Sequence, residues 1–170
     1  MSLIKKVGLG LKHIYYTTLS KLDALKGSPE SIAKGFATGV AISFTPFVGF
    51  HLLLSLFVTK ICKQNATAAA LGTIAGNPWT FPLIWYSTLH IGRLLLYQED
   101  TQSEVDFKEI FKELYHAVIT LDFEVFLSDI WPVFFPMLVG CIPLYIVVWN
   151  VVYHLIYRVL KRDNKKEKTK

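Results

Sequence analysis

An apolar segment of the chain is interrupted in its middle by Thr45-Pro46-Phe47-Val48-Gly49. Proline lacks an amide hydrogen and crowds the helical turn before it, so a helix that reaches this motif should end there. As helices, residues 31–44 and 50–60 on its two sides would be about 21 Å and about 16 Å long. Each piece is shorter than a hydrocarbon core roughly 30 Å thick. The motif therefore predicts a broken helical hairpin.

A second apolar segment follows the same plan. Small residues from 65 to 75 lead into Gly76-Asn77-Pro78-Trp79-Thr80-Phe81-Pro82, and an aromatic-rich stretch continues to about Leu96. Sliding the first segment along the chain by 32 positions places Pro46 on Pro78. Because few other positions are identical, an internal repeat and two unrelated breaks both remain open interpretations.

The placement of charge predicts that lipid surrounds these segments. Residues 35–59, 64–92 and 130–157 contain no Asp, Glu, Lys or Arg. Each of these gaps is longer than the roughly 20 residues that cross a bilayer core. A soluble helical domain would show a polar face along them, and none is evident. With 52% hydrophobic and 18% charged residues, the sequence predicts an all-α integral membrane protein with three membrane segments.

The remaining parts of the chain are charged, and together they divide it into five regions. These are a basic amphipathic helix (1–27), a core of paired broken segments (28–97), an acidic helical loop (98–130), a C-terminal transmembrane segment (131–158) and a basic disordered tail (159–170). The first helix either lies on an anionic leaflet or packs on the protein. No cleavable signal is expected, because the apolar stretch at residues 7–11 is too short.

Short motifs predict where a helix starts and where helices touch. Gly27-Ser28-Pro29 should end one helix and begin the next near Pro29, because serine caps a helix start and proline fits its first turn. Gly35 and Gly39 are four positions apart, so the backbone of another helix can approach there. We assign Gly35, Gly39 and Gly72 to helix packing.

The basic residues predict the topology. Loops rich in Lys and Arg stay in the cytoplasm, which places both termini there and makes the number of full crossings even. Three segments cannot all be simple spans, so at least one should be a re-entrant hairpin. Lys60 and Lys63 favour the first segment, with the second crossing as a kinked span and the acidic loop outside. We expect a multi-pass membrane protein with both termini in the cytoplasm.

The two breaks are the candidate functional site. Broken helix ends expose backbone groups that hydrocarbon cannot satisfy, so they persist when buried in protein or facing a watery cavity. In transporters such ends point at the substrate. The substrate-pathway candidates are Thr45, Pro46, Gly49, His51, Gly76, Asn77, Pro78, Trp79 and Thr80. The alternative is that Asn77 and Thr80 only cap the helix ends.

Other chemistry finds little support in the sequence. His51 and His90 are the histidines within the first two segments, and they are either functional groups or neutral, hydrogen-bonded side chains. The histidines and Cys62 and Cys141 lack metal-ligand spacing, so we expect no metal, no disulfide and no cofactor. Every carboxylate lies outside the apolar segments, which predicts a protein that is not an enzyme. The basic residues lie at the two ends, which argues against nucleic acid.

One combined pattern covers residues 32–96 and, loosely, the last segment. It consists of Gly35-x-x-x-Gly39, Phe44-Thr45-Pro46-x-x-Gly49-x-His51, Asn65, Gly72, Asn77-Pro78-x-Thr80-x-Pro82 and Gly92. This pattern resembles the bacterial membrane-protein family named domain of unknown function 2062. The resemblance implies a small inner-membrane protein, in a family whose domain occurs beside glycosyltransferase domains in some chains. No glycosyltransferase sequence is present in this chain, so the resemblance assigns no reaction.

Three functions remain as hypotheses. The leading one is transport or handling of a lipid-linked or small polar envelope substrate through the broken hairpins. The alternative is a non-catalytic adaptor that docks a cell-envelope enzyme such as a glycosyltransferase, and the weakest is an enzyme acting on a lipid headgroup. The expected partners are the lipid bilayer and either a second copy of the chain or an envelope-synthesis enzyme.

Overall fold

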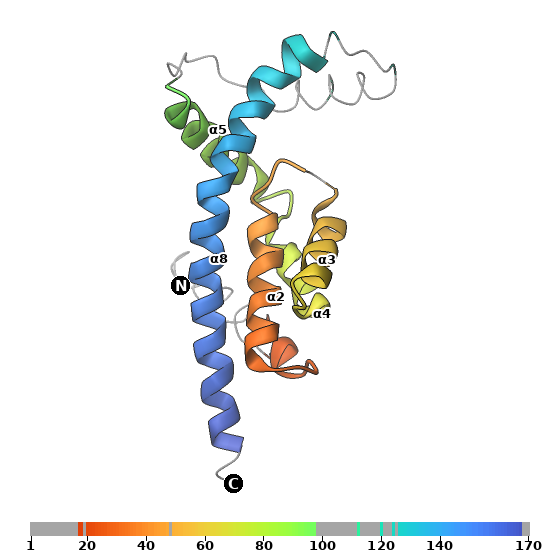
Figure 1. Ribbon diagram of the computed structural model, residues 1–170, viewed down its shortest axis with the longest axis vertical. Coiled ribbons are helices and arrows are strands. Elements are labelled where there is room, and N and C mark those ends of the chain that lie inside the picture. Colours follow the sequence, from red (N-terminus) through yellow and green to blue (C-terminus); the bar gives the residue numbers. More distant parts are fainter. Residues whose placement is uncertain are drawn as a thin grey trace, which may run out of the picture.

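The computed structural model in Figure 1 describes residues 17–18, 20–47, 49–97 and 126–167, together with 112, 120 and 124. All elements in this part of the chain are helical, which confirms the predicted all-α class there. Most of the predicted N-terminal helix (1–27) and acidic loop (98–130) lies outside the described residues.

The helices begin and end close to the predicted motifs. They are α2 (Pro29–Ile42), α3 (His51–Ile61), α4 (Ala66–Gly72), the 3₁₀ turn η1 (Thr73–Ala75), α5 (Phe81–Leu95), the π-helical turn η2 (Phe126–Ile130) and α8 (Trp131–Glu167). The Ser28 side chain caps α2 by accepting from the Ser31 amide at 3.2 Å, as predicted. Asn65 caps α4 in the same way, through the Ala68 amide at 2.8 Å.

The long helix α8 runs along the molecule, and the other helices pack on it in two places. In Figure 1, α2 lies beside the lower half of α8, and α5 crosses its upper half. The short helices α3 and α4 pack on α2. Following the chain in the same view, α2 rises, α3 descends, α4 and α5 rise, and α8 descends again. The α2–α3 hairpin therefore starts and finishes at the same end of the molecule.

Glycines set the closest helix contacts. A methyl group at Gly35 would overlap the carbonyl oxygen of Asn65, and one at Gly39 would overlap that of Ala69. Gly72 faces α2 in the same way, against the carbonyl oxygen of Phe36. The structure therefore places Gly35, Gly39 and Gly72 where α2 and α4 approach backbone to backbone.

Helix α8 is longer than the sequence indicates. It includes Pro136 and Pro143 and extends past Tyr157 to Glu167, so the predicted disordered tail from residue 159 begins too early. One reason is that Leu160, in the extra turn, is buried against Leu22. By length and composition, residues 131–162 are long and apolar enough to cross a membrane, and 22% of their apolar window is buried within the protein.

Candidate functional site

The two breaks lie side by side. The hydroxyl of Ser43, just after α2, donates to the carbonyl oxygens of Gly39 at 3.1 Å and Thr73 at 3.4 Å. Gly76 packs against the same serine, since a methyl group there would lie 2.8 Å from the Ser43 Cβ. The pairing of the breaks that the sequence hypothesis needs is thus present in the fold.

The first break is held by its own polar groups. Thr45 Oγ1 donates to the Ile42 carbonyl at the end of α2 at 2.8 Å, and the Thr45 amide donates to the same carbonyl at 2.9 Å. The His51 side chain is 6% exposed, and its Nε2 lies 3.1 Å from the Thr45 carbonyl oxygen. Because a carbonyl only accepts, Nε2 carries the hydrogen. Gly49 has φ +83°, a conformation that favours glycine, and Pro46 is half-buried.

Asn77 and Thr80 hydrogen-bond to each other in the turn that leads into α5. Asn77 Oδ1 accepts from the amides of Trp79 and Thr80 at 3.0 and 3.2 Å. Thr80 Oγ1 accepts from the Asn77 amide at 3.0 Å and donates to the Ala75 carbonyl, at the end of η1, at 2.7 Å. Neither side chain caps the start of α5, whose first turn contains Pro82. Both side chains are therefore used inside the break itself.

The rings at the two breaks form a stack. His51 and Phe81, the first residues of α3 and α5, stack with ring centroids 5.6 Å apart, and Phe81 stacks on Trp85 at 5.3 Å. Trp79 is not part of this stack, because its side chain is 92% exposed. His90 is also away from the breaks, exposed on α5 and stacked on Tyr86 at 6.0 Å.

Helix α3 buries its polar side and exposes its apolar side. His51, Ser55 and Thr59, spaced four residues apart, are 6%, 0% and 0% exposed, whereas Leu53 and Phe57 are 63% and 62% exposed. The hydroxyls of the buried serine and threonine donate to backbone carbonyls of α3 itself. This narrow polar stripe was not evident in the sequence, because three uncharged polar residues hardly lower the overall hydrophobicity of the segment.

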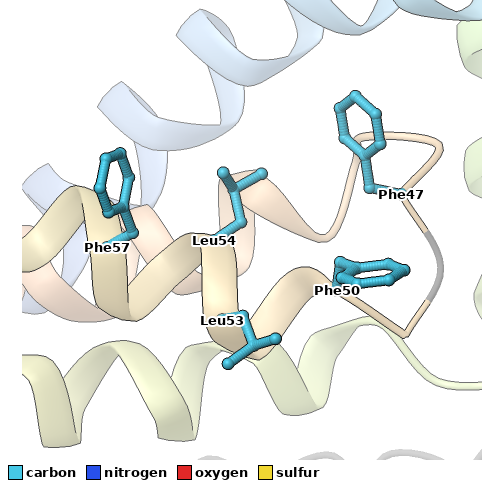
Figure 2. A pocket seen from close by; sticks show the side chains of 5 residues that line it. All are labelled: Phe47, Phe50, Leu53, Leu54 and Phe57. Atoms are coloured by element: carbon cyan, nitrogen blue, oxygen red, sulfur yellow. The ribbon is translucent and has the colours of Figure 1, made fainter.

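An apolar groove runs along the exposed side of the first break. Figure 2 shows the five side chains that line it, which are Phe47, Phe50, Leu53, Leu54 and Phe57. The groove has a volume of about 340 Å³, and Phe47 packs edge-on against Phe134 of α8, with centroids 6.1 Å apart. The sequence candidates did not include these residues. Their signal is the spacing 50, 53, 54 and 57, which places four of them on one helical face.

A buried relay joins three parts of the fold behind the hairpin. Trp149 Nε1 of α8 donates to Thr38 Oγ1 of α2 at 3.0 Å. That hydroxyl donates in turn to Gln64 Oε1, in the turn between α3 and α4, at 2.7 Å. The Thr38 side chain is fully buried. The relay fixes the hairpin to α8 through polar groups that lipid would leave unsatisfied.

Metal chemistry finds no support in the part of the chain that the structure describes. No group of three His, Cys, Asp or Glu side chains there could hold an ion. Cys62 and Cys141 are both free, the first exposed and the second buried. What the site offers is an apolar groove beside the two breaks.

Comparison with known proteins identifies the family alone. No curated protein and no solved structure matches the chain significantly. A family model matches residues 12–169, and its description is "Uncharacterized protein conserved in bacteria (DUF2062)". This is the family that the Gly, Pro and Asn-Pro motifs resemble. The chain therefore belongs to the bacterial family of the domain of unknown function 2062.

Proposed function

We propose that this protein is embedded in the bacterial inner membrane, where it binds an amphiphile such as a lipid-linked envelope precursor at its paired breaks and moves or holds it there. The observation that carries the proposal is the apolar groove, which opens on the exposed side of the first break. The polar residues of α3 lie on the buried side of that helix, opposite the groove.

The reversed polarity of α3 supports a lipid environment. In water, exposing leucine and phenylalanine while burying serine and threonine loses roughly 25 cal/mol for each Å² of apolar surface left uncovered. In lipid, the same arrangement satisfies the buried hydroxyls and matches the exposed side chains to acyl chains. Large apolar side chains are exposed on α5 and α8 as well, including Leu83 (70%), Leu94 (69%) and Ile142 (60%).

The course of the helices supports the predicted topology. Both ends of the α2–α3 hairpin lie at the same level, because the Asn65 amide donates to the Ser31 carbonyl at 3.2 Å. We propose that this hairpin enters and leaves the membrane on the cytoplasmic side. The broken α4–α5 segment then crosses the bilayer and α8 returns. The residues 131–162 of α8 span about 48 Å, which exceeds the core thickness.

The chemistry of the site favours an amphiphile over a small polar substrate. The polar side chains of Asn77 and Thr80 are occupied by hydrogen bonds within the second break, whereas the groove residues are apolar and open. A hydrocarbon chain would bind along the exposed side of α3, with its headgroup at one end of the groove. The adaptor hypothesis depends on the acidic loop, most of which lies outside the described residues.

A photolabelling experiment tests the proposal. The full chain is reconstituted in liposomes that contain a diazirine-bearing polyprenyl phosphate, and labelled positions are mapped by mass spectrometry. We expect label within residues 47–57 that an excess of unlabelled polyprenyl phosphate displaces. Phe50→Ala with Leu53→Ala should reduce this label several-fold, because both side chains line the groove.

The matched control is Leu83→Ala with Ile142→Ala, which removes a comparable apolar surface on α5 and α8 and should leave the label unchanged. Label spread evenly over all exposed apolar side chains, with no displacement by the competitor, would show that the groove has no preferred occupant and would overturn the proposal.

A further inference from the structure

The end of the molecule where α2 begins and α8 finishes carries positive charge that the described acids do not balance. Its cations are Lys21, Lys26, Lys34, Lys60, Lys63, Arg158, Lys161 and Arg162. Among residues 17–162, the acids in the same region are Asp23 and Glu30, and Glu30 is paired with Lys34 at 2.6 Å. We refer to these cations together as the basic end.

Contacts between three separate segments create the basic end. Asn65 Nδ2 donates to the Lys26 carbonyl oxygen at 3.0 Å, which holds the segment before α2 against the turn after α3. Leu22 packs with Ile156 and Leu160 of α8. The fold therefore brings cations from residues 20–28, 60–65 and 153–162 to one end. Figure 1 shows these segments together at the lower end of the view.

The cationic side chains at this end are available to a partner. Lys26, Lys60, Lys63, Arg158 and Arg162 are exposed, and none of them forms an ion pair with an acid in the described part of the chain. Lys63 adopts φ +52° in the turn after α3. The adjacent Gln64 amide donates to the Thr59 carbonyl at 2.8 Å. This closed turn keeps Lys60 and Lys63 together at the surface.

Aromatic and apolar groups border the cations. Lys161 Nζ lies 5.5 Å from the centre of the Tyr157 ring, and Tyr157 stacks on Tyr153 at 5.6 Å. Tyrosine is enriched where the headgroups of a bilayer meet its core. Ile61, next to Lys60, is 64% exposed, and Leu155, one turn before Arg158, is 58% exposed. A ligand that covers this surface must be anionic at one end and apolar beside it.

We propose that the basic end binds the headgroups of anionic phospholipids in the cytoplasmic leaflet. The phosphate would lie among the exposed lysines and arginines, and the acyl chains would continue along the apolar faces of α3 and α8. Nucleic acid or an acidic soluble protein would match the charge, but it would leave the neighbouring isoleucine and leucine uncovered. The inference requires membrane insertion, and it does not depend on what occupies the groove at the first break.

Lipid retention by the purified chain tests the inference. The protein in a zwitterionic detergent is mixed with phosphatidylglycerol or phosphatidylcholine of identical acyl chains, and bound lipid is counted by native mass spectrometry. We expect more phosphatidylglycerol than phosphatidylcholine to be retained. Lys60→Gln with Lys63→Gln should lower this preference about tenfold, because each removed charge weakens attraction to an anionic surface.

Controls separate this result from loss of folding. Lys60→Arg with Lys63→Arg keeps both charges and should keep the preference, and Lys112→Gln removes a charge from the acidic loop and should do the same. Equal retention of the two lipids, or a preference that the double glutamine variant leaves unchanged, would overturn the inference. Displacement of phosphatidylglycerol by RNA or by an acidic polypeptide at equal charge would overturn the choice of lipid as the partner.

Discussion

The side chain of Asn77 accepts from the amides of Trp79 and Thr80 in the turn before α5, and the Thr80 amide also donates to the Asn77 carbonyl at 2.9 Å. An amide hydrogen left unsatisfied in lipid costs several kcal/mol, so a residue at this break has to supply an acceptor. The requirement is structural, and it accounts for an Asn-Pro pair at the break without any substrate.

The first prediction concerns this turn. Asn77→Ala should lower the stability of the protein in detergent by about 0.5–1.5 kcal/mol, because the side-chain acceptor of the Trp79 and Thr80 amides is lost. Thermal unfolding followed by tryptophan fluorescence measures the change. Asn77→Asp keeps an acceptor and should be close to wild type, and Trp79→Ala alters an exposed side chain of the same turn. If Asn77→Ala kept full stability but lost amphiphile labelling, Asn77 would belong to the substrate pathway.

Single residues were predictable from the sequence where their role is local. Ser28 and Asn65 cap helices three or fewer positions away, so propensity and position in the chain were enough to find their helix starts. Thr38 and Trp149 are 111 positions apart in the chain and hydrogen-bond to each other. The sequence around either residue does not indicate which residue it contacts. The relay that fixes the hairpin to α8 could therefore not be derived from the sequence.

At the scale of the elements, the sequence located the breaks but not the surface that each helix presents. Proline and glycine interrupt helices by local sterics, which is why Pro46 and Pro78 marked both interruptions correctly. Which side of α3 faces the protein depends on α2 and α4, and these are separate elements. The groove at Phe50 and Phe57 was missed for the same reason. In a segment that is apolar throughout, the sequence does not distinguish the apolar residues that line a groove from those that pack inside the protein.

Helix α3 gives the second prediction. Phe57→Lys should reduce the amount of folded protein in the membrane fraction, because it places a charge among acyl chains, a change that costs about 2.5–3.5 kcal/mol at the centre of a membrane helix and less toward its ends. On a water-exposed helix the same change would be tolerated and would improve solubility. Immunoblotting of membrane and soluble fractions measures the outcome, and Phe57→Leu, which keeps the apolar surface, is the control. A soluble, monomeric Phe57→Lys variant would contradict the membrane assignment of α3.

At the scale of the whole molecule, charge and helix course point to the same orientation. The basic end includes the turn after α3 and the end of α8, whereas α5 finishes at Leu95 toward the opposite end. Sequence reasoning inferred this orientation from the basic residues near both termini and from Lys60 and Lys63. It ended α8 too early, because the extra turns are stabilised by the contact of Leu160 with Leu22, and local charge does not reveal that contact.

The last prediction tests this orientation with cysteines. Cys62 is exposed in the turn after α3, so with Cys141→Ala it becomes a single natural probe. A re-entrant first hairpin keeps that turn in the cytoplasm. A membrane-impermeant maleimide should then label Cys62 in inside-out vesicles and leave it unlabelled in intact spheroplasts.

A second probe at the far end of α5 fixes the other side of the membrane. Tyr97 is 96% exposed, and Tyr97→Cys in a background without Cys62 and Cys141 should be labelled in intact spheroplasts. If both positions were labelled from outside, the first hairpin would be a full crossing. The basic end would then be split between two leaflets, although the hydrogen bond from Asn65 to Lys26 holds two of its segments together. That contact would have to open, so we expect the two probes to be labelled from opposite sides.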